Sequence, residues 1–359
     1  MEMVVGKRSI GGGEWEDITR DFGGPGEYRE WQKATRGFDI TLPFGDLIET
    51  YIYEVFIPDR TLRFNTKRNY MNAYRLNMQG TEITRIPFED VQAIDLQLFY
   101  NKTDGPCCEI RMLNNLLIKV YDFLQLWTDV INIARVVRPP AAVNTRKSHV
   151  EVWSDDDLKK IMAGLSTNPR IRFMIILLIN TGCRISEILG LKESDFKNGA
   201  VNIERQLLKK HDLAGKSNIT WYELAPPKSN DGIRRIPVTA KVMDELSLHT
   251  AWHDEEMLRR GCESDLLFTS MNGRPVDKRM LSLNFKNYYE SIGVEPKGFH
   301  VYRHTFGTNL CRSGVPIQVA SKLLGHSSVK VTSQYYVNID DQQKMEAIEK
   351  YTKGLDDLT

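Results

Sequence analysis

The sequence predicts a mainly α-helical fold with a small antiparallel β-sheet, arranged as an N-terminal helical bundle followed by an α+β domain. Between residues 41 and 137, apolar side chains recur every three or four positions, which is the period of helices packed on a core. Short β-prone segments bounded by turn residues gather between residues 200 and 238. A chain of 359 residues is also too long for one ordinary core, so we expect two or three domains, one of them large.

The composition is that of a water-soluble protein. Hydrophobic residues make up 41% and charged residues 26% of the chain, and the formal net charge is +1. This near-neutral charge neither indicates nor excludes a nucleic-acid partner, because binding depends on where Lys and Arg gather. The five cysteines lack C-x-x-C spacing, the longest apolar run, residues 173–179, is too short for a bilayer, and no signal peptide pattern opens the chain. We therefore expect a cytoplasmic protein with free thiols.

The N-terminal part divides into an arm, a helical domain and a linker. Residues 1–40 mix glycine clusters with scattered aromatic residues, and this arm stays unassigned. Residues 41–137 carry the helical period with breaks near Pro58, Gly80, Pro87 and Gly105, so at least four helices are expected. Residues 138–150 contain prolines, small residues and charges, which is the composition of an interdomain linker.

A basic segment lies inside the helical domain. On a helix, its charged residues and the asparagines between them suit contact with phosphates, whereas each one alone is better explained as a solvated surface residue. Only as a set do these residues favour DNA as the binding partner. The residues of this basic segment are Arg60, Arg63, Lys67, Arg68 and Arg75.

The second domain, residues 151–339, begins with a helix signal. Ser154 followed by three aspartates suits a helix N-terminus, and residues 170–179 predict a buried helix that ends at Thr181 and Gly182. We expect strands at residues 200–203, 220–224 and 234–238, with a turn at residues 226–232. After Thr239 the pattern indicates helices joined by short loops.

Arginine and histidine motifs suggest a site for a phosphodiester. Cleavage of this group without a metal requires cations beside its nonbridging oxygens, and arginine supplies a planar, permanently charged donor. Arg184 begins an R-I-S-E motif in which Glu187 could hold its guanidinium from one helical turn away. A simple surface ion pair between these two residues is the alternative.

Three further residues stand at positions i, i+3 and i+4, so that a helix presents them on one face: His300, Arg303 and His304. Together with His326 the histidines could form a zinc site, but an arginine between the ligands disfavours a dication, and no H-E-x-x-H glutamate accompanies them. We therefore predict no metal and no other cofactor. His326 follows Gly325 at a corner between two helices, where a purely structural role is the alternative.

The ordered set of R-I-S-E, a turn lysine, H-x-x-R-H, L-G-H and a final tyrosine resembles the tyrosine recombinase family of phage-type integrases and mobile-element transposases. The resemblance spans residues 153–336. It implies a core-binding helical domain that forms a C-shaped DNA clamp with the catalytic domain. It also implies a site-specific recombinase that cuts and rejoins strands through a covalent 3′-phosphotyrosyl intermediate, without metal or ATP.

The resemblance also assigns roles to individual residues. Arg184 and Arg303 would clamp the scissile phosphate, and His300 and His326 would hydrogen-bond its oxygens. Lys228 would protonate the leaving 5′ oxygen as general acid, although an exposed turn lysine that touches phosphate is the alternative. Glu187 and His304 would have supporting roles.

The nucleophile is one of two adjacent tyrosines. The residues around these tyrosines resemble the subgroup of the family whose sequence motif is T-x-x-x-Y-x-H, and this match favours Tyr336 as the nucleophile. Asn338 replaces the last histidine of that motif, so Tyr335 stays the second candidate. A tyrosine hydroxyl has a pKa of about 10 and needs a cationic surrounding and a base to attack.

The expected partners are double-stranded DNA, namely element ends and target sites, and further copies of the chain. Residues 340–359 form a tail with a small apolar stripe, and in the family such a tail docks on the next protomer, which implies dimers to tetramers on DNA. An accessory DNA-bending or directionality protein would fit, and a membrane would not. The resemblance places the enzyme in a bacterial cytoplasm, at the nucleoid.

Two other functions stay open: a type IB topoisomerase-like nicking-closing enzyme and an inactive DNA-binding accessory protein.

Overall fold

The computed structural model describes residues 2–11, 14–21, 23–24, 27, 38–126, 128–141, 151–167, 169–214, 219–333, 345 and 349. The chain divides into two compact units, one with Met1–Thr145 and Lys210–Thr220 and the other with Arg146–Lys209 and Trp221–Thr359. Most of the expected linker lies outside the described residues, as do Tyr335 and Tyr336 and all of the tail except Met345 and Glu349.

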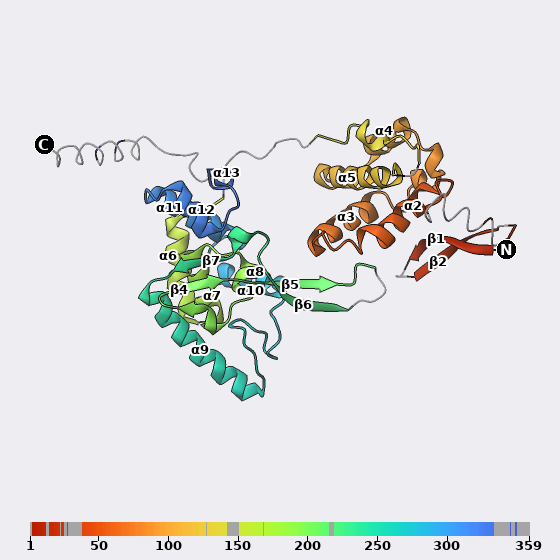
Figure 1. Cartoon of the computed structure of the whole chain (residues 1–359). Coiled ribbons are helices and arrows are strands. Elements are labelled where there is room, and N and C mark those ends of the chain that lie inside the picture. The colour runs from red at the N-terminus through yellow and green to blue at the C-terminus, as the bar shows by residue number, and fades with distance from the viewer. Residues whose placement is uncertain are drawn as a thin grey trace. The chain divides into compact units, whose positions relative to one another are not determined.

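The first unit is built on a helical bundle (Figure 1). Its α-helices are α2 (Phe44–Tyr51), α3 (Phe64–Asn77), α4 (Ala93–Lys102) and α5 (Cys107–Leu124), and a π-helical turn, η1 (Ile52–Phe56), extends α2. Short 3₁₀ turns follow at η2 (Glu82–Arg85), η3 (Phe88–Asp90) and η4 (Ile133–Arg135). The four α-helices confirm the expected minimum.

Spacing and prolines explain this bundle. On α5 the residues Leu113, Leu117 and Val120 recur at helical spacing and are all 0% exposed, so one face of the helix forms the centre of the core. Pro106 stands at the N-cap of α5 and Pro87 at that of η3, because proline lacks the N–H that a helix interior needs. The helix breaks expected at Pro87 and Gly105 are thereby confirmed.

The N-terminal arm contains a β-hairpin that the sequence did not predict. Strands β1 (Glu2–Gly11) and β2 (Glu14–Asp21) pair antiparallel, with register shifts between Val4 and Gly6 and between Ser9 and Gly11. Glycine is common where a strand bulges, since it adopts bulge conformations without strain. Gly6 and Gly11 thus lie at the irregular points of the hairpin.

The second unit places helices around one core (Figure 1). Its helices are α6 (Asp155–Ala163), α7 (Pro169–Thr181), α8 (Ile185–Ile188), α9 (Ala240–Arg260), α10 (Lys278–Ser291), α11 (His300–Arg312), α12 (Ile317–Leu324) and α13 (Val329–Thr332), with 3₁₀ turns η5 (Gly164–Thr167), η6 (Glu193–Asp195) and η7 (Asn230–Gly232). The predicted N-cap is confirmed, since the Ser154 hydroxyl accepts from the Asp157 amide at 3.1 Å. The buried helix predicted at residues 170–179 is α7.

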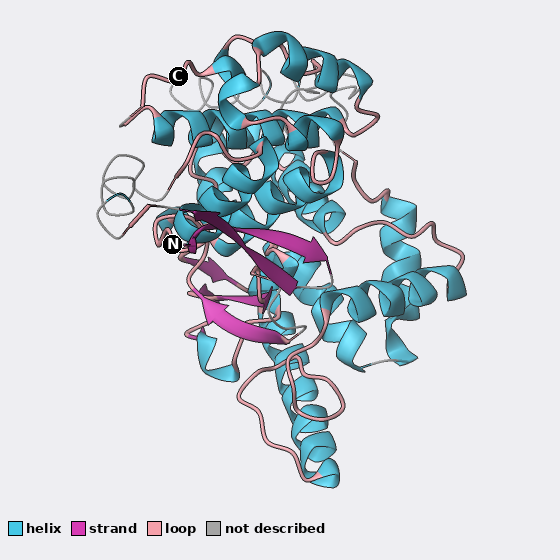
Figure 2. Ribbon diagram, turned by 90° about the vertical axis from the view of Figure 1, so that its right-hand side faces the viewer, coloured by secondary structure: helices cyan, strands magenta, loops and turns pink. Residues whose placement is uncertain are grey.

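Beyond the N-terminal hairpin, the β-structure forms two pieces, and Figure 2 draws the strands in magenta among cyan helices. Strands β3 (Phe196–Lys197), β4 (Ala200–Ile203) and β7 (Arg234–Pro237) make an antiparallel sheet in the order β3-β4-β7, and β5 (Gln206–His211) pairs with β6 (Thr220–Ala225). All three predicted strands are present as β4, β6 and β7, but β3 and β5 were not predicted. On β7, Arg234 and Ile236 lie on the buried face and Arg235 on the exposed one.

No helix in the described part of the chain combines the length and the apolar character that crossing a membrane requires.

Candidate active site

Arg184 is fixed at the start of α8 by Glu187. The Arg184 backbone N–H donates to Glu187 Oε2 at 3.0 Å, and Arg184 Nη1 donates to Glu187 Oε1 at 2.7 Å. The Glu187 side chain is 1% exposed, whereas that of Arg184 is 34% exposed. The alternative of a surface ion pair is therefore wrong: a buried carboxylate holds a guanidinium that still reaches the surface.

A second arginine, which the motifs did not point to, binds the same carboxylate. Arg234 Nη2 donates to Glu187 Oε2 at 2.9 Å, and the Arg234 side chain is 6% exposed. Burial acts to raise the pKa of Glu187, but the positive charges of Arg234 and Arg184 outweigh it and lower that pKa below its ordinary value. The sequence signal for Arg234 was strand alternation, which puts it on the same face as Ile236.

Arg303 is fixed by carbonyl groups from two neighbouring segments. It lies on α11, is 1% exposed, and donates to Gly182 O at 3.0 Å and to Leu324 O at 2.5 Å. Gly182 has φ +60°, and a Cβ there would lie 2.3 Å from the Phe306 ring. The T-G-C-R run after α7 therefore requires glycine to pass this close to α11.

His300 and His304 lie one helical turn apart, with ring centroids 5.2 Å apart. His304 Nδ1 is 3.3 Å from the carbonyl oxygen of Glu151, so this ring faces the first described residue after the linker. Burial lowers the pKa of His304. Among the described residues, no three His, Cys, Asp or Glu side chains are grouped so that they could hold a metal ion.

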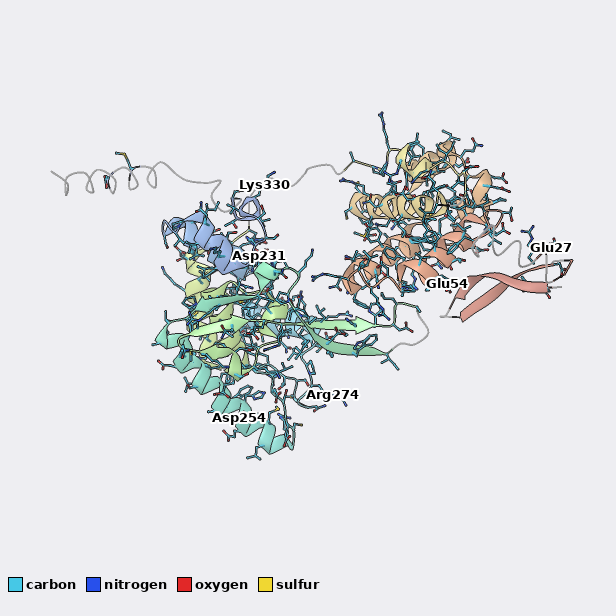
Figure 3. The ribbon with its side chains drawn as sticks, in the orientation of Figure 1. Glu27, Glu54, Asp231, Asp254, Arg274 and Lys330 are labelled. Atoms are coloured by element: carbon cyan, nitrogen blue, oxygen red, sulfur yellow. The ribbon has the colours of Figure 1, made fainter. Side chains whose placement is uncertain are left out.

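His326 lies at the corner between α12 and α13. Gly325 ends α12 in the left-handed conformation, and His326 Nδ1 is 2.9 Å from the Thr332 hydroxyl, which is 0% exposed. A Cβ on Gly325 would lie 2.8 Å from the Asp231 carbonyl oxygen, and Figure 3 labels Asp231 on the connection between β6 and β7. The Leu-Gly-His corner thus packs directly on that connection.

Electrostatic interactions show which of these groups lie together. Burial, together with the positive charges of Arg303, Arg184 and Arg234 and the neighbouring His300 ring, lowers the pKa of His326 to about 4. Burial also lowers the pKa of His300 to about 4, followed by the effects of His304, Arg303 and Arg184. Both rings are therefore neutral at cellular pH. We call this set the active-site cluster: Arg184, Glu187, Arg234, His300, Arg303 and His326.

Lys228 lies outside this set of contacts. It is exposed on the connection between β6 and β7, next to the 3₁₀ turn η7. Gln206 Nε2 donates to the carbonyl of Pro226 at 2.9 Å, and a Cβ on Gly232 would lie 2.5 Å from Pro227. The turn around Lys228 is therefore held at both ends, while no hydrogen bond among the described residues joins Lys228 to the cluster.

The basic segment of the first unit separates into two kinds of residue. Arg60 and Arg63 are exposed and Arg68 is half-buried on α3. Lys67 instead donates to Ile57 O at 2.5 Å, and Arg75 donates to the Tyr53 hydroxyl at 2.8 Å. The last two residues stabilise their own unit as well as adding charge.

The candidate nucleophiles follow the described chain directly. α13 ends at Thr332, and Ser333 is the last described residue before Tyr335 and Tyr336. In the sequence they lie nine and ten residues after His326.

Comparison with known proteins identifies the family of this chain. The profile of the phage integrase family matches residues 151–343. A tyrosine recombinase XerC-like protein of Caldanaerobacter subterraneus subsp. tengcongensis is 28% identical over 327 residues, which cover 87% of this chain and 82% of that protein. The transposase of transposon Tn916 from Enterococcus faecalis is 28% identical over 189 residues, which cover 50% of this chain and 45% of the transposase.

Two solved structures have the same fold. The Tn1549 transposon integrase in complex with transposon right end DNA superposes with a TM-score of 0.63 at 19% identity, over 84% of this chain and 98% of that one. A lambda integrase dimer bound to a COC' core site superposes with a TM-score of 0.55 at 18% identity, over 80% of this chain and 95% of that one. Since the family profile also covers more than half of the sequence, this chain belongs to the phage integrase family of tyrosine recombinases and is a site-specific DNA recombinase, an enzyme that cuts and rejoins DNA strands.

Proposed function

We propose that the active-site cluster binds the scissile phosphate of double-stranded DNA and that Tyr336 attacks it, with Tyr335 as the second candidate. The observation that carries this proposal is the convergence of three helical segments: Arg303 on α11 donates to the carbonyl of Gly182, two residues before Arg184, and to that of Leu324, two residues before His326. The charges of Arg184 and Arg303 accordingly act on the rings of His300 and His326. A phosphodiester is the ligand that such a set of donors suits best.

The two arginines of the clamp have different exposure. Arg184 reaches the surface with 34% of its side chain, so it is the guanidinium most accessible to a nonbridging oxygen. Arg303 is 1% exposed and is oriented by two carbonyl groups, so it adds a fixed positive charge beneath the phosphate. Charge placed before the reaction stabilises the developing negative charge without reorganisation.

The proton transfers use neutral histidines and a lysine. His326 and His300 are neutral at cellular pH, so each can hydrogen-bond a phosphate oxygen, and one can accept the tyrosine proton. The tyrosine oxygen bonds to phosphorus as the bond to the 5′ oxygen breaks, and Lys228 donates its proton to that leaving oxygen. The 3′-phosphotyrosyl bond keeps the phosphodiester energy, so rejoining a 5′ hydroxyl needs neither ATP nor a metal.

Substrate and assembly follow from the relatives. The Tn1549 integrase and the lambda integrase were both solved on DNA, the latter as a dimer, which supports DNA as the partner of this chain and assembly of dimers to tetramers on it. Element ends and target sites are the proposed substrates. The recombinases, integrases and transposases among the relatives favour this function over a nicking-closing topoisomerase. The intact cluster favours an enzyme over an inactive accessory protein, and we place it in the cytoplasm, at the nucleoid.

A covalent trapping experiment tests the proposal. Binding sites selected from a random duplex library would be rebuilt as suicide substrates with a nick beside the cleavage position, so that the released fragment diffuses away. The wild-type chain should form a protein–DNA adduct in the presence of a chelator, and mass spectrometry should map it to Tyr336. An adduct at Tyr335 would correct the nucleophile, while an adduct at neither tyrosine would overturn the mechanism.

A further inference from the structure

Arg234 contacts three segments that lead to proposed functional groups, namely Arg184, Lys228 and His326. Its guanidinium donates to Glu187 Oε2 at 2.9 Å, to the carbonyl of Leu323 at 2.8 Å and to the carbonyl of Gly232 at 2.9 Å. Glu187 in turn holds Arg184, and Leu323 belongs to the Leu-Leu-Gly-His run that ends at His326. Gly232 closes the turn that follows Lys228.

From this geometry we infer that Arg234 is a positioning residue for strand cleavage, which fixes Arg184, His326 and the Lys228 turn relative to one another. The inference rests on the proposed function and deepens it. Arg234 itself need not touch DNA, because its side chain is 6% exposed and its donors point to protein acceptors.

Packing makes the connection between Arg234 and His326 rigid. A Cβ on Gly325 would lie 3.0 Å from Arg234 Cδ and 3.1 Å from Arg234 Nη1. The residue before His326 therefore rests on the Arg234 side chain, and there is no space between them. Loss of the long side chain would leave the Leu-Gly-His corner without this support.

Charge makes the connection between Arg234 and Arg184 specific. Glu187 is 1% exposed and is shared by both guanidinium groups. Without Arg234, only Arg184 of these two arginines would still pair with the buried Glu187 carboxylate. The unbalanced negative charge would then draw the Arg184 guanidinium inward, away from the phosphate. A lysine cannot replace the interaction, because a single ammonium group does not match three acceptors arranged around a planar fork.

Arg235 provides a matched control on the same strand. It is exposed on the opposite face of β7, and its Nη2 donates to the carbonyl of Asn198 at 2.9 Å. Arg235→Met makes the same exchange of a charged side chain for an uncharged one as Arg234→Met, at the next position of the strand. It leaves the contacts of Arg234 with Glu187, Gly232 and Leu323 intact.

The experiment compares Arg234→Met, Arg234→Lys and Arg235→Met on two suicide substrates, one ordinary and one with sulfur in place of the leaving 5′ oxygen. A thiolate leaves without protonation, so the sulfur substrate bypasses the general acid. We expect Arg234→Met to bind DNA within about twofold of wild type, since its contacts are internal, and to lose on the order of 100-fold in adduct formation on the oxygen substrate. The loss on the sulfur substrate should be clearly smaller, and Arg235→Met should cleave both substrates as wild type does.

Several results would overturn the inference. One is a folded Arg234→Met protein that cleaves at the wild-type rate. Another is an equal loss on both substrates, which a general weakening of the fold would produce. Thermal denaturation reports whether each variant folds, and if Arg234→Met does not, Arg234→Lys provides the same comparison. A wild-type chain that forms no adduct with either substrate would instead remove the proposed function on which the inference rests.

Discussion

The active-site cluster and the basic segment hold their arginines in opposite ways. In the cluster, Arg234 and Arg303 are nearly inaccessible, and each donates to at least two protein acceptors. In the basic segment, Arg60 and Arg63 are exposed. Buried, hydrogen-bonded guanidinium groups keep one geometry, whereas exposed ones move within the solvent and are screened by salt.

This difference in how the arginines are held assigns catalysis to the active-site cluster and DNA affinity to the basic segment. A reaction at one phosphorus atom requires donors at fixed places, so changes in the cluster should reduce rate by large factors. Contact with a DNA backbone requires positive charge in the right region, so changes in the basic segment should reduce affinity in small, additive steps. The predictions below test that separation, starting with the largest effect.

Tyr336→Phe should abolish the covalent adduct while DNA affinity stays unchanged, because it removes the attacking oxygen and little else. Adduct formation on a suicide substrate and a gel-shift titration measure the two quantities. Tyr335→Phe is the control and should keep the adduct. The reverse pattern would move the nucleophile by one residue.

Arg184→Ala should slow adduct formation by about 100- to 1,000-fold, which is typical for loss of one donor to a developing negative charge. Arg172→Ala is a matched control, because Arg172 also joins a mostly buried carboxylate, with Nε 2.7 Å from Glu245 Oε2. Single-turnover kinetics of both variants should separate loss of a buried ion pair from loss of the phosphate donor. Similar rates for the two variants would contradict the assignment of Arg184.

Gly325→Ala should destabilise the chain more than Gly261→Ala. Both glycines end helices in the left-handed conformation, and each substitution costs about 1–2 kcal/mol for that reason. Only at Gly325 does the new Cβ also meet neighbours, with the Asp231 carbonyl at 2.8 Å, while nothing lies within 4 Å at Gly261. The collision adds about 1–3 kcal/mol. Urea denaturation should rank the two variants in this order, and equal losses would argue against the tight corner.

The free energy of unfolding should fall as the pH falls from about 6.5 to about 4. Burial and the neighbouring arginines lower the pKa of His326 to about 4 in the folded chain, while the unfolded chain has the ordinary value of about 6.5. Above pH about 6.5 the His326 ring is neutral in both the folded and the unfolded chain, so its contribution to the free energy of unfolding is fully present. Between pH about 6.5 and about 4, the ring gains a proton only in the unfolded chain, which lowers that free energy. Denaturant titrations of His326→Gln should give a shallower pH dependence. An unchanged slope would mean that His326 is not desolvated.

The smallest effects should come from Arg60, Arg63 and Arg68 of the basic segment, of which the first two are exposed and the third is half-buried. Arg60→Ala, Arg63→Ala and Arg68→Ala should each weaken DNA binding a few-fold and lower the salt dependence by about one unit per lost phosphate contact. The adduct rate at saturating protein should not change. A hundredfold loss of rate in any of these variants would remove the distinction between the two regions.

Much of the fold was predictable because its signals are local. The Ser154 cap, helix α7 and strands β4, β6 and β7 follow from side-chain period and turn residues within a few positions. The pairing of Arg184 with Glu187 follows from their i,i+3 spacing. The β1–β2 hairpin was missed because glycines at its bulges interrupt the two-residue alternation.

The rest of the site depends on contacts between distant residues. The burial of Glu187 and the role of Arg234 require β7 to pack beside α8, 47 positions away in sequence. His304 was expected to support the site, and the carbonyl of Glu151, 153 positions away, determines where its ring faces. No short motif encodes such pairings, so only the folded chain reveals them.

The most direct measurement of the central claim uses DNA in which a methyl group replaces one nonbridging oxygen of the scissile phosphate. That phosphate is neutral, so it no longer requires the positive charge of the clamp. If Arg184 neutralises the phosphate, Arg184→Ala should form the adduct on the methylphosphonate far faster than on the ordinary phosphate, relative to wild type. If the variant is equally slow on both substrates, Arg184 does not act on the phosphate, and the account of the active-site cluster is wrong.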